Sequence, residues 1–241
     1  MAKYLIINAD DFGYALGVNQ GIIAAYEQGI VLSTSLKVDA PLATEAAVLA
    51  RRHPNLGVGL HFTATNTQGP VIDLFDVAAV ERELVRQYQR CCDLLGKPPT
   101  HLDSHHHVHL RRELQPVFLA WATGQRLPLR GLGLVQYNSG FYGQWYDEEW
   151  QLHPAPELIG VDNLTRILQT LPEGITELAC HPGHLSADLH SSYATEREIE
   201  LATLLNPRVL TAIRHLGITL TNFAALPKLL GGQDAITRSL T

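Results

Sequence analysis

Residues 4–29, YLIINADDFGYALGVNQGIIAAYEQG, contain the pattern that decides the fold class. Residues 4–9 are an apolar run of strand length, which predicts a buried strand. Residues 17–28 follow as an expected helix, because apolar residues recur at helical spacing and Gly29 provides a stop. This strand and helix predict the opening unit of an α/β fold.

The same alternation of strand and helix patterns continues along the chain. Further strands are expected at residues 31–38, 56–62, 100–105, 127–132, 133–137, 175–180 and 218–221, and further helices at 42–52, 77–95, 111–122, 161–171, 195–205 and 207–215. Asp76 and Asn206 are expected N-caps, and Thr195 with Glu198 forms a capping-box pattern. Single helices between strands imply right-handed βαβ units and a mostly parallel sheet.

The number of strands bears on the architecture. A sheet of about seven strands suits a closed or nearly closed barrel better than an open sheet. No linker divides the chain, so residues 1–241 are expected to form a single domain.

The composition excludes several classes of protein. With 46% hydrophobic and 17% charged residues among 241, the chain is not of the disordered class. A formal charge of −6, from 18 Lys+Arg and 24 Asp+Glu, argues against nucleic-acid binding. No apolar run reaches the roughly 18 residues of a membrane span. The first residues lack a signal-peptide pattern and the three cysteines form no disulfide framework, so a cytoplasmic location is expected.

Four of the expected strands carry aspartate or histidine residues at or just after their carboxyl ends. They lie in the motifs NADDFG (8–13), GLHF (59–62), DSHHHVH (103–109) and CHPGH (180–184). In parallel α/β folds these strand ends share one rim, which carries the active site. Each motif alone has a simpler explanation, such as a turn, a helix cap or a core histidine. Their shared position predicts a metal or acid–base site.

The residue types in these motifs suit a divalent metal. Two imidazoles and one carboxylate, with positions open for water, suit Zn²⁺, Mn²⁺, Co²⁺, Fe²⁺ and, less readily, Mg²⁺. Such a metal lowers the pKa of bound water and polarises a carbonyl group. One of two adjacent aspartates can hold the metal while the other takes a proton from water, and a histidine opposite can protonate a departing amine. Together these groups suit metal-assisted hydrolysis of an amide.

Residues 138–156 interrupt the pattern with a glycine-containing, aromatic-rich stretch. The aromatic residues are Phe141, Tyr142, Trp145, Tyr146 and Trp150. The stretch is expected to be a long functional loop. Because flat apolar rings stack well on sugars, the loop is expected to form a wall of a sugar site. Packing of these rings on the barrel or on a partner subunit is the alternative explanation.

The strand-end motifs, with VNQGI (18–22), HLDSHHHVH (101–109) and ELACHPGH (177–184), resemble those of the YdjC-like carbohydrate deacetylases. That family includes chitooligosaccharide deacetylases and members associated with hopanoid biosynthesis. The motifs follow the family's order over nearly the whole chain. The resemblance implies a distorted TIM-like (β/α) barrel. It also implies metal-dependent removal of an N-acetyl group from an amino sugar or a short N-acetylated oligosaccharide.

The resemblance also implies roles for individual residues. Asp10 is implied to be the general base that activates water, and His181 to be the proton donor to the departing amine. The implied ligands of one divalent metal, Mg²⁺ or Zn²⁺, are Asp11, His61 and His105. His107 is the rival third ligand, because it lies on the same side of an extended strand. Residues expected to orient a ligand or contact substrate are Asp103, His107, His109, Trp145 and Tyr146.

Two other kinds of protein stay open on the sequence alone. One is a different metallohydrolase on the same barrel, either an amidohydrolase or a phosphoesterase. A phosphoesterase needs a cationic clamp, for which Arg111, Arg112 and Arg130 are available. The other is a non-catalytic sugar- or metal-binding protein, which has no need for Asp10 beside Asp11. The expected partner is an N-acetylated sugar, without nucleic acid or membrane, and a homodimer stays open.

Overall fold

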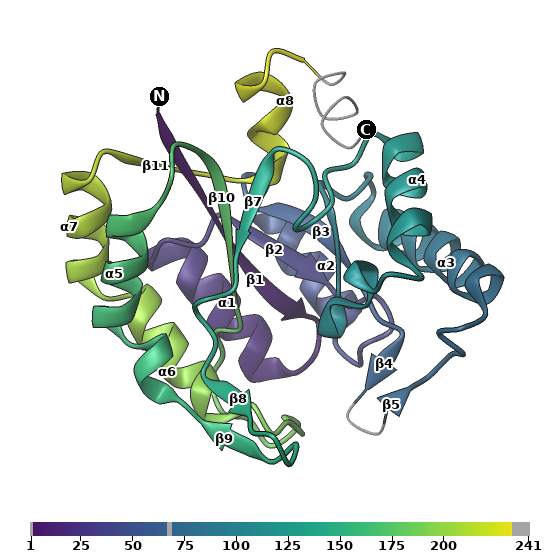
Figure 1. The fold of residues 1–241 in the computed structure, drawn as a ribbon, viewed down its shortest axis with the longest axis horizontal. Coiled ribbons are helices and arrows are strands. Elements are labelled where there is room, and N and C mark those ends of the chain that lie inside the picture. Colours follow the sequence, from purple (N-terminus) through teal and green to yellow (C-terminus); the bar gives the residue numbers. More distant parts are fainter. Residues whose placement is uncertain (1, 67–68, 233–241) are drawn as a thin grey trace.

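The fold is built on a seven-stranded curled sheet whose strands pair in parallel (Figure 1). The computed structural model describes residues 2–66 and 69–232. The strands of this sheet are β1 (Lys3–Phe12), β2 (Ser33–Leu36), β3 (Gly57–Phe62), β6 (Leu102–Ser104), β7 (Val135–Asn138), β10 (Gly174–Cys180) and β11 (Ile218–Thr221). Their order is β6-β3-β2-β1-β10-β7, and β11 also pairs with β1. The sheet forms a half-barrel, which confirms the expected TIM-like fold class.

Strand β1 lies at the centre of the sheet and positions the first two aspartates. One of its edges bonds to β10 over Lys3–Ala9. The other edge bonds first to β11 and then, nearer its carboxyl end, to β2. The register with β2 shifts after Ala9, which marks a local irregularity at Asp10 and Asp11. The central strand therefore ends in a distorted segment that carries both aspartates.

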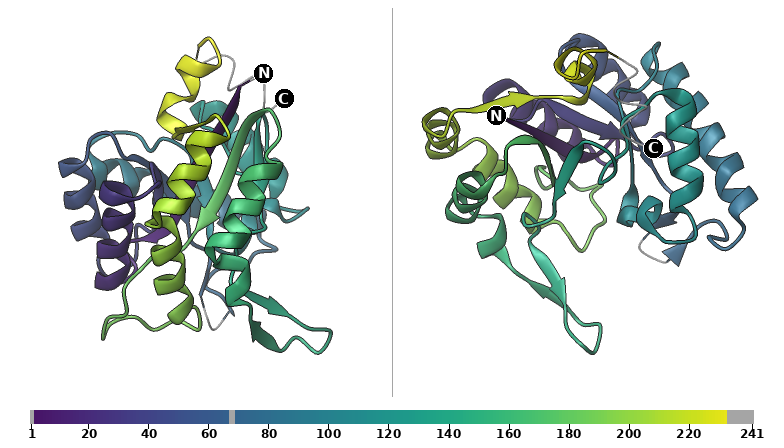
Figure 2. Two further views of the ribbon diagram at one scale, coloured as in Figure 1. Left: turned by 90° about the vertical axis from the view of Figure 1, so that its left-hand side faces the viewer. Right: turned by 45° about the horizontal axis from the view of Figure 1, so that its top comes forward.

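Helices surround the outer side of the curled sheet (Figures 1 and 2). They are α1 (Leu16–Gln28), α2 (Ala43–Arg52), α3 (Val77–Leu95), α4 (Gln115–Gln125), α5 (Val161–Thr170), α6 (Thr195–Leu204) and α7 (Pro207–His215). Helix α8 (Leu226–Leu229) lies apart from them, at the end of the molecule where β1 begins, and its Leu226 belongs to a second apolar cluster with Ile6 of β1 (Figure 1). The short 3₁₀ helices are η1 (His105–Leu110), η2 (Pro156–Ile159) and η3 (Phe223–Ala225). A large apolar cluster joins α1, through Val18 and Ile22, to β1, through Leu5 and Ile7. No described helix combines the length and apolarity that a membrane span requires.

The structure differs from expectation where the barrel would close. Residues 127–132 make one isolated bridge, between Leu129 and Leu102, in place of the expected strand. Pro128 lacks the backbone N–H that a longer ladder needs, and the chain then turns at two glycines with positive φ angles. The strand expected at residues 133–137 forms as β7. Within the described chain the sheet ends at β6 and β7, so it curls without closing.

The helix caps follow the expected signals in two of three cases. Asp76 and Asn206 cap α3 and α7 by accepting backbone N–H groups at 3.0 and 2.9 Å. The capping box expected at Thr195 and Glu198 is wrong, because α6 begins without a side-chain cap. Glu198 instead accepts a hydrogen bond from the Leu185 N–H at 3.3 Å, so its carboxylate serves a different segment.

Two antiparallel hairpins project at the end of the molecule where β1 ends (Figure 1). One pairs β4 (Thr65–Asn66) with β5 (Gly69–Pro70), and the other pairs β8 (Gln144–Tyr146) with β9 (Leu152–Pro154). The second hairpin lies within residues 138–156. The sequence predicts a long loop over residues 138–156, but part of that segment forms this hairpin.

Candidate active site

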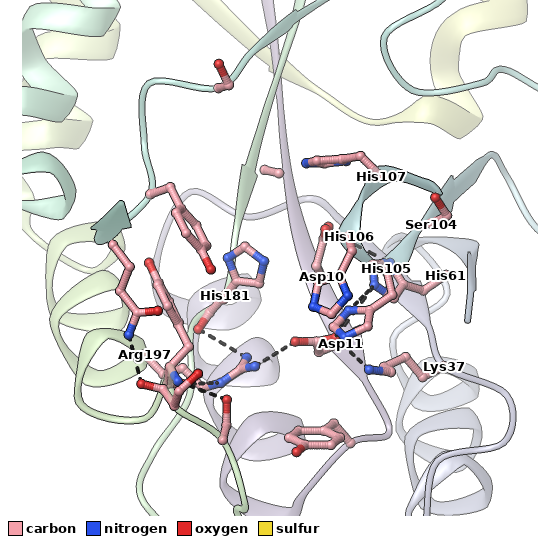
Figure 3. Close-up of a pocket in the computed structure, with 18 of the residues that line it drawn as sticks. Asp10, Asp11, Lys37, His61, Ser104, His105, His106, His107, His181 and Arg197 are labelled. Carbon is pink, nitrogen blue, oxygen red and sulfur yellow. Dashed lines mark hydrogen bonds and ion pairs between the residues drawn. The ribbon is translucent and has the colours of Figure 1, made fainter. Parts of the chain in front are cut away.

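A cavity of about 420 Å³ opens at the carboxyl ends of the strands, and each hairpin contributes to its wall (Figure 3). The predicted site residues that line it are Asp10, Asp11, His61, His105, His107, Tyr146 and His181. Three others, Asp103, His109 and Trp145, lie outside its lining. The strand-end motifs thus meet in one place, as the parallel topology requires.

Three donor atoms converge on one side of the cavity (Figure 3). Asp11 Oδ1 lies 3.6 Å from His61 Nε2 and 3.5 Å from His105 Nδ1, and the two imidazole nitrogens lie 3.5 Å apart. Ligands about 2.1 Å from a tetrahedral zinc ion are separated by roughly 3.4 Å. Asp11 Oδ1 is buried and accepts no hydrogen bond within the described part of the chain, although it forms an ion pair with Lys37 at 3.2 Å, so it keeps lone-pair capacity for a metal. The three residues therefore fit one divalent metal.

The backbone that carries these residues is locally distorted. Asp11 has a φ angle of 70°, and His106 and His107 have φ angles of 54° and 50°. Non-glycine residues rarely adopt this left-handed conformation, and strained residues of this kind cluster at functional sites. The distortion separates two histidines that an extended strand would place on one side. His105 joins Asp11, whereas His107 Nε2 lies 3.2 Å from the Tyr137 hydroxyl.

Asp103 orients His61 through the ring nitrogen that does not face Asp11. The His61 Nδ1–H donates to Asp103 Oδ1 at 2.7 Å, which leaves the Nε2 lone pair facing Asp11. Burial opposes the charge on Asp103, but nearby Arg130 and His61 outweigh burial and lower the pKa of this carboxyl. His109, which is expected to orient a ligand or contact substrate, lies outside the cavity lining. It bonds the Ser104 hydroxyl at 2.5 Å and the Arg130 carbonyl at 3.1 Å, so it supports the backbone.

Asp10 is held by a bidentate ion pair with Arg130. Two N–H groups of the guanidinium donate to the two carboxylate oxygens, each at 2.7 Å, and the Asn8 amide donates to Oδ1 at 2.8 Å. Burial opposes ionisation, but Arg130 outweighs burial and lowers the pKa of Asp10. Asp10 is therefore ionised at neutral pH in a fixed orientation, as a proton acceptor requires.

Arg130 is completely buried and does not act as the phosphate clamp considered from the sequence. Besides its bidentate pair, it contacts Asp103 at 2.9 Å and Glu177 at 2.7 Å. Three carboxylates thus occupy the donors that a phosphate group would need. Arg111 and Arg112 are exposed and lie outside the cavity lining.

His181 lies on a different side of the cavity from the three donor atoms (Figure 3). Its Nδ1 is 3.7 Å from Glu200 Oε1, and Glu200 also accepts hydrogen bonds from the His181 N–H and the Tyr193 hydroxyl. Burial disfavours the imidazolium, but Glu200 outweighs burial and raises the pKa of His181. His181 is thereby suited to donate a proton near neutral pH.

The turn after His181 packs directly on α1. A Cβ at Gly21 would lie 2.5 Å from Gly183 Cα, and a Cβ at Gly17 would lie 2.0 Å from the His184 carbonyl oxygen. The His184 N–H donates to the Gly17 carbonyl at 2.9 Å. Glycine at these two helix positions therefore permits the close contact that fixes the His181 turn.

Two cations flank Asp11. Arg197 of α6 donates to Oδ2 at 2.6 Å, and Lys37, immediately after β2, places Nζ 3.2 Å from Oδ1. Burial opposes ionisation, but Lys37 and Arg197 outweigh it and lower the pKa of Asp11 well below its usual value. Burial also lowers the pKa of His105 to about 2, so its imidazole is neutral, as a metal ligand must be.

The aromatic segment contributes to the cavity only in part. Phe141, Tyr142 and Tyr146 line the cavity, whereas Trp145 stacks on His153 with ring centroids 4.8 Å apart. Trp150 is 82% exposed. Neither tryptophan packs in the core, and the cavity is lined by Tyr146 rather than by Trp145.

Sequence reasoning missed four residues that shape the site, namely Lys37, Tyr193, Arg197 and Glu200. A lysine near the end of an expected strand could have marked Lys37, because strand ends meet at the site. Arg197 and Glu200 are buried one helical turn apart on α6. Polar residues at that spacing are usually exposed, so the sequence carried no signal for them.

A parallel α/β half-barrel that gathers aspartate and histidine around one cavity at its strand ends has the arrangement of a hydrolase active site. The chain belongs to the YdjC-like family, whose model, described as YdjC-like protein, matches residues 4–215. It is 35% identical to the chitooligosaccharide deacetylase of Serratia marcescens over 263 residues, covering 94% of this chain and 100% of that protein. It is 33% identical to the carbohydrate deacetylase of Geobacillus stearothermophilus over 256 residues, covering 95% and 100%.

Solved structures share the fold. A structure from Enterococcus faecalis V583, described as a cellobiose-phosphate cleavage protein, matches with a TM-score of 0.80 and 28% identity. The match covers 94% of this chain and 99% of that one. A family 4 carbohydrate esterase from Streptomyces lividans, in complex with acetate, has a TM-score of 0.55 over 90% and 91% of the two chains. At 16% identity, this second likeness is evidence of the fold alone.

Proposed function

We propose that this protein is a metal-dependent hydrolase that removes an N-acetyl group from an amino sugar or a short N-acetylated oligosaccharide. The observation that carries the proposal is the convergence of Asp11, His61 and His105 in one cavity with Asp10 and His181. Membership of the YdjC-like family and the names of the two relatives support a sugar amide as the substrate. The free cysteines support a reducing compartment, the cytoplasm, as the location.

Asp11, His61 and His105 would hold the metal, Mg²⁺ or Zn²⁺. When bound there, the metal supplies a Lewis acid and lowers the pKa of a bound water molecule. Asp103 keeps His61 in the tautomer that can ligate, and Arg197 holds the Asp11 oxygen that faces away from the two histidines.

Asp10 and His181 would move the two protons of the reaction. Asp10 accepts the proton of the water that attacks the acetyl carbonyl, while Arg130 holds its carboxylate in place. His181 gives its proton to the sugar nitrogen as the C–N bond breaks, because an amide anion is a very poor leaving group. Glu200 favours the protonated form of His181 until that step. A base and an acid in one cavity favour hydrolysis over sugar binding alone.

Acetate release tests the proposal. The metal-loaded protein is incubated with N-acetylglucosamine and with chitooligosaccharides, and acetate is measured before chelation, after chelation and after metal is restored. We expect release to stop on chelation and to return with the metal. If the metal-loaded protein releases no acetate from any N-acetylated sugar, the deacetylase proposal is wrong.

The metal group, by which we mean Asp11, His61 and His105, leads to a prediction that does not depend on activity. His61→Ala removes one of three converging donors, so we expect metal affinity to fall by more than about 100-fold, beyond the usual effect of losing a supporting residue. Metal content after dialysis measures the change. His107→Ala is the matched control, because His107 faces Tyr137, and it should keep its metal. Full occupancy in His61→Ala would reject the ligand assignment.

The β8–β9 hairpin leads to a second prediction. Tyr146→Ala removes a ring from the cavity wall, so KM for an N-acetylated sugar should rise by about 2- to 10-fold, the usual worth of a ring contact. Trp145→Ala is the matched control on the same strand, because that ring stacks on His153 outside the cavity. A larger rise in KM for Trp145→Ala than for Tyr146→Ala would move the sugar contact to the other face of the hairpin.

A further inference from the structure

Lys37 is a buried cation at the metal group that the proposed reaction does not use. It lies immediately after β2, and its side chain runs into the cavity beside Asp11 (Figure 3). Its backbone is fixed on both sides, because its N–H donates to the Phe12 carbonyl at 2.9 Å and its carbonyl accepts from the Ala40 N–H at 3.1 Å. The residue is only 8% exposed. Its ammonium group is therefore held at the site rather than in solvent.

The ammonium contacts the same oxygen that faces the two histidines. Lys37 Nζ lies 3.2 Å from Asp11 Oδ1, the atom that His61 Nε2 and His105 Nδ1 approach at 3.6 and 3.5 Å. It also lies 4.9 Å from the centre of the Tyr14 ring, a cation–π contact. Arg197 differs from Lys37, because it binds the other oxygen of Asp11. A metal held by Asp11, His61 and His105 would therefore compete with Lys37 for one carboxylate oxygen, whereas Arg197 binds the other oxygen.

This placement has opposite effects on the two forms of the protein. Without a metal, a buried Asp11 carboxylate needs a nearby cation, because an unpaired buried charge is strongly destabilising. With a divalent metal on the same oxygen, the ammonium is a like charge at short range in a site of low dielectric. A group that stabilises the metal-free form and opposes the metal-bound form lowers metal affinity.

We propose that Lys37 is an internal competitor for the divalent metal at Asp11. It neutralises Asp11 in the metal-free protein and makes the metal more readily exchangeable. This inference concerns the metal group on which the proposed function rests, but it does not require that the substrate be a sugar. It predicts that removal of the Lys37 charge tightens metal binding.

Zinc titration of the stripped protein, read with a competing chelating dye, tests the proposal. Lys37→Met should bind Zn²⁺ at least about tenfold more tightly than the unchanged protein, because a close like charge is gone. Lys37→Arg keeps the charge and should stay within about threefold of the unchanged protein. Lys97→Met removes an exposed lysine and controls for net charge, so its Kd should not change. Equal or weaker zinc binding by Lys37→Met would overturn the proposal.

Thermal unfolding supplies a second measurement. The metal-free Lys37→Met protein should unfold at a lower temperature than the unchanged protein, and added Zn²⁺ should raise its midpoint by a larger amount. If metal-free Lys37→Met does not fold, Lys37→Gln replaces it, because an amide can still donate to Asp11 without a charge. Zinc binding by Lys37→Gln that is no tighter than that of the unchanged protein would also overturn the proposal.

The same experiments separate this inference from the proposed function. Tighter zinc binding by Lys37→Met without acetate release from any sugar would reject the deacetylase proposal and support the competitor. Acetate release together with an unchanged zinc Kd for Lys37→Met would support the deacetylase proposal and reject the proposal that Lys37 competes with the metal.

Discussion

Replacing Asp10 with asparagine is expected to lower kcat by about 10²- to 10⁴-fold while the protein keeps its metal. The asparagine side chain has nearly the same shape, but its amide cannot take the proton of the attacking water. The metal should stay, because the three converging donor atoms belong to Asp11, His61 and His105. Acetate release and metal content, measured on the same preparation, check both parts.

A control variant separates the loss of the base from disturbance of the buried ion pairs. Glu177→Gln changes another carboxylate on Arg130, at 2.7 Å from its Nε, but Glu177 does not line the cavity. Its kcat should therefore fall far less than that of Asp10→Asn. If Asp10→Asn loses its metal together with its activity, Asp10 is a ligand and the assignment as base is wrong.

Replacing His181 with alanine is expected to lower turnover of an N-acetyl sugar by about 10²-fold or more, with the metal retained. The physical reason is the leaving group, because an amine must gain a proton before it departs. An activated aryl ester has a leaving group that needs no proton, so its hydrolysis should fall much less. Equal losses on the amide and the ester would show that His181 supports the metal or the fold instead.

The pH dependence gives a further measurement of the same residue. Glu200 raises the pKa of His181 above its ordinary value of 6.5, and the acid form must be present when substrate binds. The rate should therefore fall as pH rises through that raised pKa. Glu200→Gln removes the carboxylate, so this fall in rate should occur at lower pH. If the fall occurs at the same pH in Glu200→Gln, a group other than His181 causes it.

The fold could be predicted where local signals agree with the packing. The helix expected at residues 77–95 forms with those bounds as α3, because Asp76 caps its start and Gly96 ends it in a left-handed conformation. Residues 127–132 have the composition of a strand but make one bridge, because Pro128 lacks the backbone N–H that a longer ladder needs. The pairing of β8 with β9 depends on contacts between the two short strands rather than on a local signal, so the sequence did not predict this hairpin.

The candidate site could be predicted as far as topology brings residues together. Asp10, Asp11, His61 and His105 lie at or just after the carboxyl ends of strands, so the shared rim of a parallel sheet was enough to group them. Arg197 and Glu200 come from a helix, and only its tertiary packing brings them to the cavity. Trp145 and Tyr146 illustrate a different limit, because neighbours on a strand face opposite sides and a loop assignment conceals that alternation.

The division between sheet and hairpins has a consequence for altering the protein. Asp10 and Asp11 lie at the end of the central strand, whose residues 3–9 pair with β10 along one edge and with β11 and β2 along the other, so the amide protons of residues 3–9 should exchange only when the whole domain unfolds. The β8–β9 hairpin pairs with no strand of that sheet, and it supplies Tyr146 to the cavity wall. The proposed reacting groups and this part of the cavity wall therefore belong to separate parts of the chain. Grafting a different hairpin between Gly143 and Ala155 is expected to change substrate preference while the proposed reacting groups stay in place.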